Sequence, residues 1–398
     1  MPNLANIESC TGCSACANVC PKNAIGMVPD NEGFLLPVVD ESKCVNCGLC
    51  ERSCPALSSD LPWGNLEPDV YAGWHKQDRS DSSSGGLFSS FARMVLKDGG
   101  SVFGSYLSAD LNCFHKEIST IEDLCLLRGS KYVQSEIGSV YKTLKKRLDD
   151  GRKVLFCGTS CQVAGLKCFL RKDYENLLTI DLVCHGVPSN LIFKSYVKKL
   201  QKKLNLNKEI ERFEFRNRDG WGMKSAFSVD QEHLKPLYGV DALYQSAFDK
   251  SALFRKSCYS CTYTRVPRMG DISLADFWGI GRYGIPFSHD VMKGVSLVLI
   301  NTSKGEKALC ALDDDTFIEK RTLEEALIEN HNLKATSFMH HRRNEIVRDF
   351  LDEDISLQEI DKRYHLVEHS LKSAIKEISS KLGFSEVAKR IYNKVKTL

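Results

Sequence analysis

Apolar residues recur at strand and helix spacings through the middle of the chain. The apolar stretch from Val70 to Trp74 predicts a short strand. A helical run follows it, with apolar residues at Phe88, Phe91, Val95 and Leu96. Further strands and helices are predicted in turn at residues 138–150 (helix), 154–156 (strand), 177–183 (strand) and 190–200 (helix). Strands that alternate with helices indicate a largely parallel sheet, and the loops after its strands lie on one edge, where ligands bind.

The end of the chain has a different pattern. Helices are predicted at residues 303–312 and 340–351, and from residue 362 to residue 398 nine Lys or Arg stand against three Glu. Apolar positions within this basic tail fall on one face, at Val367, Leu371, Ile375, Ile378, Leu382, Val387, Ile391 and Val395. A basic amphipathic helix can lie on an anionic membrane or on a partner, or pack on its own domain with its lysines outside. Both alternatives stay open.

Cysteines dominate the start of the chain. The run Cys-x-x-Cys-x-x-Cys-x-x-x-Cys-Pro occurs twice, at residues 10–21 and 44–55, and two such runs are typical of two-cluster ferredoxins. The fourth cysteine of each run serves the other cluster. The predicted 4Fe-4S ligand sets are therefore Cys10, Cys13, Cys16 and Cys54 for one cluster, and Cys44, Cys47, Cys50 and Cys20 for the other.

Two other uses of these cysteines fit the spacing poorly. A disulfide framework predicts a short secreted chain, and structural zinc predicts paired CxxC units without a third and fourth cysteine in step. The chain has 398 residues, 42% of them hydrophobic, and a net charge of only +3. This length predicts two domains and a tail, and this charge does not indicate nucleic-acid binding. Seventeen cysteines, with no signal peptide and no apolar run long enough for a bilayer, predict a reducing cytoplasm.

A Ser/Gly-rich turn follows the first predicted strand of the second domain. It consists of Ser82, Ser83, Ser84, Gly85 and Gly86, and it leads into a helix. Free backbone N–H groups at a helix start favour phosphate, and glycine lets a ligand approach the backbone. The turn is therefore either an anion-binding loop or an ordinary flexible helix cap.

A third cluster is predicted at the edge of the sheet. Cys161 and Cys184 each follow a buried strand, and a CxxC pair stands at Cys258 and Cys261. We expect these four thiols to bind a third 4Fe-4S cluster. Cys157 competes for one place, although its position at the end of an apolar strand suits a packed thiol better. The other cysteines are given no role; they are Cys113, Cys125, Cys168 and Cys310.

Six ordered motifs carry a family resemblance. They are SSSGG (82–86), GSKYVQS (129–135), GTSCQVAGL (158–166), DLVCHGVPS (181–189), CYSC (258–261) and GDISLADFWG (270–279). Together with the N-terminal cysteine runs, they resemble the coenzyme F420 hydrogenase/dehydrogenase beta-subunit family from about Cys10 to Asn301. The resemblance implies an iron–sulfur flavoprotein that uses FAD to connect two-electron chemistry with one-electron clusters. Beyond Asn301 the motifs stop.

The resemblance also implies roles for particular residues. It assigns Ser83, Ser84, Gly85 and Gly86 to FAD phosphate, Ser130, Lys131 and Tyr132 to the flavin, and Cys161, Cys184, Cys258 and Cys261 to a cluster. Members of the family often have no cysteine at the position of Cys157. A cation at Lys131 stabilises reduced anionic flavin, although an unplaced lysine is more often solvated. His185 either relays a proton or hydrogen-bonds its loop. Five further side chains have two alternatives, because each either faces an anionic group of the substrate or FAD or is solvated. They are Arg216, Arg218, Trp221, Arg265 and Arg268.

The predicted fold class is α+β and multidomain: a small ferredoxin-like two-cluster domain, then an α/β flavin- and cluster-binding domain with a helical tail. The predicted boundaries are 1–58 for the ferredoxin domain, 59–69 for a linker, 70–345 for the FAD and third-cluster domain, and 346–398 for the tail.

The predicted function is electron transfer between a deazaflavin, or another organic two-electron substrate, FAD and 4Fe-4S clusters. A ferredoxin-type carrier or an oxidoreductase subunit is the expected redox partner, and peripheral membrane contact through the tail is the further option. One alternative is a reductase that takes electrons from reduced ferredoxin. The other is a non-catalytic electron-transfer or docking subunit.

Overall fold

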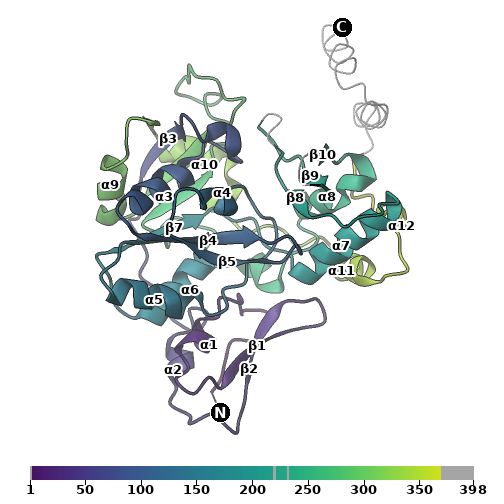
Figure 1. The fold of residues 1–398 in the computed structure, drawn as a ribbon, viewed down its shortest axis with the longest axis horizontal. Coiled ribbons are helices and arrows are strands. Elements are labelled where there is room, and N and C mark those ends of the chain that lie inside the picture. The colour runs from purple at the N-terminus through teal and green to yellow at the C-terminus, as the bar shows by residue number, and fades with distance from the viewer. Residues whose placement is uncertain (1, 218–220, 231–232, 369–398) are drawn as a thin grey trace.

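The computed structural model describes residues 2–217, 221–230 and 233–368. Figure 1 shows a small N-terminal module below a central sheet, and a mainly helical lobe beside that sheet. Of the predicted basic tail, residues 369–398 lie outside the described residues. The mixed α/β architecture with a ferredoxin-like start confirms the predicted fold class.

The N-terminal module is built from one hairpin and two short helices. Strands β1 (Ile25–Pro29) and β2 (Leu35–Val39) pair antiparallel, and helices α1 (Ala15–Val19) and α2 (Leu49–Arg52) each lie within one cysteine run. Each helix starts after a residue with positive φ, Ser14 at 61° and Gly48 at 66°. These tight entries turn the chain so that cysteines three apart point to one place.

The central sheet has eight strands in the order β13-β3-β12-β11-β7-β6-β4-β5. In chain order they are β3 (Asp69–His75), β4 (Ser101–Leu107), β5 (Cys113–Ile118), β6 (Val154–Thr159), β7 (Leu177–Leu182), β11 (Ile272–Asp276), β12 (Ser296–Ile300) and β13 (Thr316–Arg321). Strands β4, β6, β7 and β11 are mutually parallel, whereas the other pairings are antiparallel. The sheet is thus mixed rather than largely parallel, because apolar periodicity carries no information on strand direction.

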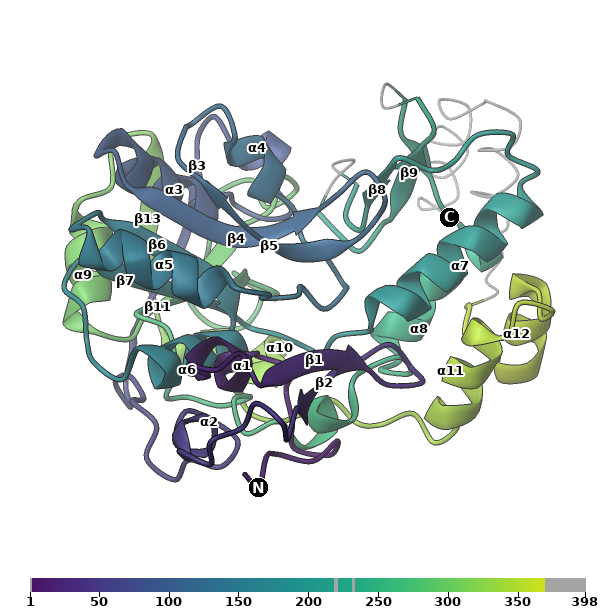
Figure 2. The same ribbon diagram turned by 60° about the horizontal axis from the view of Figure 1, so that its bottom comes forward.

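Helices cover both faces of this sheet (Figures 1 and 2). One face packs on α3 (Leu87–Lys97) and α9 (Ser303–Cys310), and the other on α5 (Val140–Asp149), α6 (Ser160–Leu170) and α10 (Leu323–Glu329). Strand β6 shows the alternation: Leu155 and Cys157 enter one core, and Val154 and Phe156 enter the other. A short helix, α4 (Leu124–Leu127), lies against β4.

The lobe beside the sheet has a core of its own. It contains α7 (Asn190–Lys203), α8 (Leu243–Asp249), α11 (Arg343–Leu351) and α12 (Leu357–Tyr364), with the small sheet β8 (Arg212–Glu214), β9 (Ala226–Ser228) and β10 (Lys235–Pro236). Single 3-10 turns occur at η1 (Arg79–Asp81), η2 (Gly239–Ala242), η3 (Lys256–Ser260) and η4 (His331–Leu333). Ser189 caps α7, its hydroxyl accepting from Ile192 N at 3.2 Å. Helices α11 and α12 pack on α7, so the described start of the tail belongs to this lobe.

One edge of the sheet collects the loops that matter below. Strands β3, β6, β7 and β11 run in the same direction, so their carboxyl ends lie at that edge. The serine turn follows β3, Cys161 follows β6, and Cys184 follows β7. The fold therefore brings residues from distant parts of the chain to one site.

Candidate functional site

Four thiols of the N-terminal module gather in one buried place: Cys10, Cys13, Cys16 and Cys54. Burial, together with the nearby thiols of Cys10 and Cys54, raises the pKa of Cys16 to about 12. Burial and the thiols of Cys16 and Cys54 likewise raise the pKa of Cys13. Gly12 N donates to Cys10 Sγ at 3.4 Å. Four sulfurs crowded in one place are suited to a metal cluster, which deprotonates its thiols and holds them together.

A second group of thiols surrounds a cavity of about 20 Å³. Its lining includes Cys20, Cys44, Cys47 and Cys50. Cys20 comes from the first cysteine run and the other three come from the second, and these are the four cysteines that the spacing assigns to the second cluster. Ala24 N donates to Cys20 Sγ at 3.3 Å. Cys47 is exposed, so this group reaches the protein surface.

A third group lies at the carboxyl edge of the central sheet. Cys161 is in the first turn of α6, Cys184 follows β7, and Cys258 and Cys261 are in and directly after η3. Burial, with the thiols of Cys161 and Cys261 close by, raises the pKa of Cys184 to about 12. Burial, with Cys161 nearby, raises the pKa of Cys261 to about 11. The structure thus brings together the four cysteines assigned to a third cluster.

The remaining cysteines do not complete another group. Cys157 lines the cavity described below, but it packs in the apolar core of the sheet. Cys113 is buried, and Cys125 and Cys310 are exposed. Cys168 lies on α6, where burial raises its pKa to about 11 with the Cys54 thiol nearby. None of the seventeen cysteines, all within the described residues, forms a disulfide.

A buried ion pair holds the loops of the third group. Arg268 Nη2 lies 3.2 Å from Asp181 Oδ1, and the two side chains are 1% and 0% exposed. The same nitrogen donates to Ser160 Oγ at 2.7 Å and to Leu182 O at 3.1 Å, and Arg268 Nη1 donates to Tyr263 O at 2.8 Å. Each of these partners lies within two residues of a cysteine of the third group: Ser160 of Cys161, Leu182 of Cys184, and Tyr263 of Cys261. One guanidinium therefore fixes the relative positions of three cysteine-bearing segments.

A cavity of about 310 Å³ adjoins the third group. Its lining includes Cys161, Cys184, Cys258 and Cys261, and it extends to the serine turn and to residues 129–135. A single, partly open space thus touches the thiols of the third group at one part and a Ser/Gly turn at another. This is the size and mixed lining of a site for an organic cofactor or substrate.

The serine turn presents its backbone rather than its hydroxyls. Ser83 Oγ accepts from Ser130 N at 2.8 Å, and Ser84 Oγ donates to Val295 O at 3.0 Å. Within the described residues, the amides of residues 83–86 have no hydrogen-bond partner. They precede α3, which begins at Leu87 after Gly86 with φ of 84°. Free amides at a helix start fit an anionic group such as phosphate.

Residues 130–132 form the next part of the cavity lining. Lys131 Nζ donates to Leu127 O at 2.9 Å and to Arg128 O at 2.8 Å, so it is fixed rather than solvated. Burial lowers the pKa of Lys131 to about 8. Burial also raises the pKa of Tyr132 to about 12, and its hydroxyl donates to Met223 Sδ at 3.1 Å.

Comparison with known proteins connects this geometry to a family. Residues 151–326 match the model for the C terminus of the coenzyme F420 hydrogenase/dehydrogenase beta subunit, and residues 9–57 match a 4Fe-4S dicluster domain. Residues 151–326 therefore carry the C-terminal domain of this family. The resemblance drawn from the motifs is confirmed. The beta-subunit domain contains all four cysteines of the third group, and the dicluster domain contains the other eight.

Individual relatives match over shorter stretches. An uncharacterized polyferredoxin-like protein of Methanocaldococcus jannaschii is 36% identical over 66 residues, 15% of this chain and 39% of the relative. The polyferredoxin-like subunit of an aliphatic sulfonate oxidoreductase of Pyrococcus furiosus is 35% identical over 65 residues, 16% of this chain and 36% of the relative. The chain thus spans less than two-fifths of either relative. A chain of the F420-reducing NiFe hydrogenase complex of Methanosarcina barkeri has a TM-score of 0.44 at 15% identity, covering 77% of this chain and 95% of that one.

The cavity lining also contains functional candidates that sequence reasoning left open or missed. Arg216 had two alternatives, facing an anionic group or being solvated; its side chain is 2% exposed and ion-paired with Asp276 at the cavity. His115 received no role, but it is buried in the cavity lining, and burial lowers its pKa to about 4. His185 is exposed and lines the same cavity, while its backbone O accepts from Ser337 Oγ at 2.7 Å. Sequence spacing gives no signal for such long-range pairings.

The dicluster module is fixed to the beta-subunit domain by buried polar contacts. Arg255, 2% exposed, donates through Nε to Cys10 O at 2.7 Å and through Nη2 to Leu35 O at 2.9 Å. Ser257 Oγ donates to Cys10 O at 2.9 Å. These donors directly precede Cys258. The chain segment that carries one ligand of the third group thus also holds a ligand loop of the first group.

Helix α6 connects the same two groups on its other side. A β-carbon added at Gly165 would lie 2.8 Å from Cys13 Cβ and 2.9 Å from Cys13 Sγ, so only glycine lets the module approach this closely. Cys161 is four residues earlier on the same helix, a rise of about 6 Å. The first and third groups are thus separated by about one helical turn.

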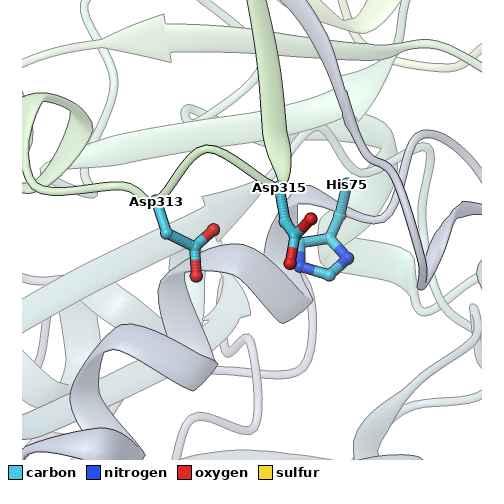
Figure 3. Close-up of side chains that lie close together, drawn as sticks. All are labelled: His75, Asp313 and Asp315. Atoms are coloured by element: carbon cyan, nitrogen blue, oxygen red, sulfur yellow. The ribbon is translucent and has the colours of Figure 1, made fainter.

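A different set of metal-type ligands lies away from the cavity. His75, Asp313 and Asp315 place their ligand atoms within 4.8 Å of one another (Figure 3). Their groups already have protein partners: Asp78 N donates to His75 Nδ1 at 3.0 Å, Lys97 Nζ lies 2.7 Å from Asp313 Oδ2, and Gln77 Nε2 donates to Asp315 Oδ2 at 3.0 Å. We therefore interpret this cluster as a polar network that joins β3 to β13.

No helix in the described part of the chain is both long enough and apolar enough to cross a membrane.

Proposed function

We propose that this chain is an iron–sulfur flavoprotein oxidoreductase. It passes electrons between an organic two-electron substrate, a deazaflavin of the F420 type or another compound, and 4Fe-4S clusters, with FAD between them. The observation that carries the proposal is the shared cavity: the free amides of the serine turn, the fixed Lys131 and the four thiols of the third group all line one space. An electron-transfer protein without an organic cofactor has no need of such a space.

Residues that precede the matched beta-subunit domain would hold FAD in the cavity. The backbone amides at Ser83, Ser84 and Gly86 would bind its phosphates, and Ser130, Lys131 and Tyr132 would contact its ring. When bound, FAD exchanges two electrons with organic molecules and single electrons with clusters. With a pKa near 8, Lys131 is mostly protonated at neutral pH, so it places a cation where negative charge develops. His185 gives or takes a proton at its imidazole, beside Cys184.

The positions of the cysteine groups support a route for single electrons. The third group is next to the cavity, the first group is about one turn of α6 away, and the second group reaches the surface at Cys47. An external ferredoxin-type carrier or a partner protein would exchange electrons with the chain at Cys47.

The first test is the content of iron, acid-labile sulfide and extractable flavin in the full chain, purified without oxygen. We expect about twelve iron and one FAD per chain, four iron for each cluster. Cys184→Ser should lower the iron by about four and leave the dicluster module intact. Cys168→Ser, which changes a thiol of the same region without an assigned ligand role, is the control.

About eight iron and no flavin would refute the proposal and leave an electron-transfer or docking subunit. If FAD is present, stopped-flow mixing with reduced coenzyme F420 identifies the substrate class: flavin and cluster reduction within seconds supports the deazaflavin. If the chain holds FAD but F420 does not reduce it, the remaining function is reduction of another organic substrate by ferredoxin.

A further inference from the structure

Arg216 is a buried cation with one unused donor. It follows β8 and lines the cavity, and its side chain is 2% exposed. Nη1 forms an ion pair with Asp276, and Nε donates to Gly222 O at 3.1 Å. Nη2 is buried and has no hydrogen-bond partner among the described residues. A buried donor of this kind is uncommon in native structures, because it has given up its hydrogen bonds to water without replacing them.

The surroundings hold Arg216 in one orientation. Trp221 Nε1 donates to the second oxygen of Asp276 at 2.6 Å, so the carboxylate is fixed from two sides. Trp221 stacks on Trp278 with ring centroids 4.7 Å apart, and the Arg216 guanidinium lies 5.5 Å from the centre of the Trp278 ring. Arg216 is therefore preorganised, with two of its nitrogens satisfied by protein hydrogen bonds. The Tyr132 hydroxyl also interacts with this guanidinium, but Nη2 has no hydrogen-bond partner among the described residues.

We propose that Arg216 Nη2 binds an anionic group, a carboxylate or a phosphate, of the organic substrate in the cavity. This inference rests on the proposed function and specifies the substrate class for it. The anion belongs to the substrate rather than to FAD, because the serine turn supplies free amides for the cofactor phosphates, and residues 130–132 lie between that turn and Arg216. Ser83 contacts Ser130 at one end of this segment, and Tyr132 donates to Met223, near Arg216, at the other.

Calorimetric titration of the oxygen-free holoprotein with two isosteric probes tests the proposal. The probes are 2-naphthoate, which is anionic at pH 7, and 2-naphthamide, which is neutral. A hydrogen bond from a charged donor predicts that the wild-type chain binds 2-naphthoate about ten- to hundredfold more tightly. Arg216→Gln should bind both probes alike. Arg216→Lys keeps the charge beside Asp276 but lacks the second fork nitrogen, so it should fold normally and lose most of the preference.

Arg282→Gln is the matched control, because the Arg282 side chain is 70% exposed and paired with Glu329 at 3.4 Å; its preference should equal that of the wild type. Equal affinities for both probes in the wild type, or a preference that survives in Arg216→Gln, would overturn the proposal. A loss of extractable flavin from Arg216→Gln would also overturn it, because Arg216 would then bind the cofactor. If the wild-type chain contains no flavin, the proposed function is refuted. The anion-binding role of Arg216 is then still decided by whether the chain prefers 2-naphthoate to 2-naphthamide.

Discussion

Arg268→Met should remove the third cluster while sparing the other two. Arg268 and Asp181 are 1% and 0% exposed, and Arg268 also donates to Ser160 Oγ, Leu182 O and Tyr263 O. Methionine fills similar volume but leaves the Asp181 carboxylate buried without its cation. Breaking a buried ion pair from one side costs about 3–5 kcal/mol. The loops that carry Cys161, Cys184 and Cys261 lose their common anchor at the same time.

The matched control is a second buried ion pair of the same domain. Arg321 Nη2 lies 2.6 Å from Glu325 Oε1, with side chains 1% and 3% exposed, and it contacts no cysteine-bearing loop. Arg321→Met should therefore lower the free energy of unfolding by a similar amount, about 3–5 kcal/mol, without selective loss of iron. The assay is iron per chain together with the electron paramagnetic resonance spectrum of the reduced protein. If Arg268→Met keeps all its iron, or if both variants lose iron equally, the anchoring role of Arg268 is wrong.

Two further predictions concern His115 and Gly165. Burial lowers the pKa of His115 from 6.5 to about 4, so the unfolded chain binds more protons between these values and stability falls as pH decreases through this window. Between pH 7.5 and pH 5.5 the wild type should lose about 1.3 kcal/mol more than His115→Gln in urea unfolding, and equal losses would show that His115 titrates normally. Gly165→Val should displace Cys13 and slow electron transfer from the cavity to the dicluster module in stopped-flow experiments. Gly26→Ala, where an added β-carbon meets only Val28 Cγ2 at 3.9 Å, should not slow it.

Local sequence patterns were sufficient to predict part of this structure. The cysteine runs fix which thiols meet, because three-residue spacing and positive-φ entries at Ser14 and Gly48 act within a few residues. Strands β3, β6 and β7 and helices α3, α5 and α7 were predicted close to their observed bounds for the same reason, whereas β4, β5, α4 and α6 received no predicted bounds. The rest depends on contacts between distant residues. Arg268 meets Asp181 across 87 positions, and the antiparallel partners of β3 come from beyond residue 295. Neither periodicity nor composition contains such pairings.

Solvation of arginines is the clearest case in which the usual expectation fails. An isolated arginine in a sequence is best assumed to be exposed. Arg216 and Arg268 are buried because acidic partners, Asp276 and Asp181, stand at or near the ends of adjacent strands, and the fold alone brings those partners near. Burial of a guanidinium is favourable only with such a partner in place.

The same rule explains why the dicluster module is docked on the main body of the chain rather than tethered loosely to it. Arg255 and Arg343 belong to the main body and are 2% and 1% exposed, but partners on which they depend are in the module: Cys10 O and Leu35 O for Arg255, and the Glu32 carboxylate for Arg343 at 2.5 Å and 2.6 Å. Undocking would leave two guanidinium groups without these acceptors, at a cost of several kcal/mol for each charge that stays buried. The module therefore stays docked on the main body, and α6 fixes the distance from the third group to the first. We expect a mobile carrier to approach at the exposed Cys47.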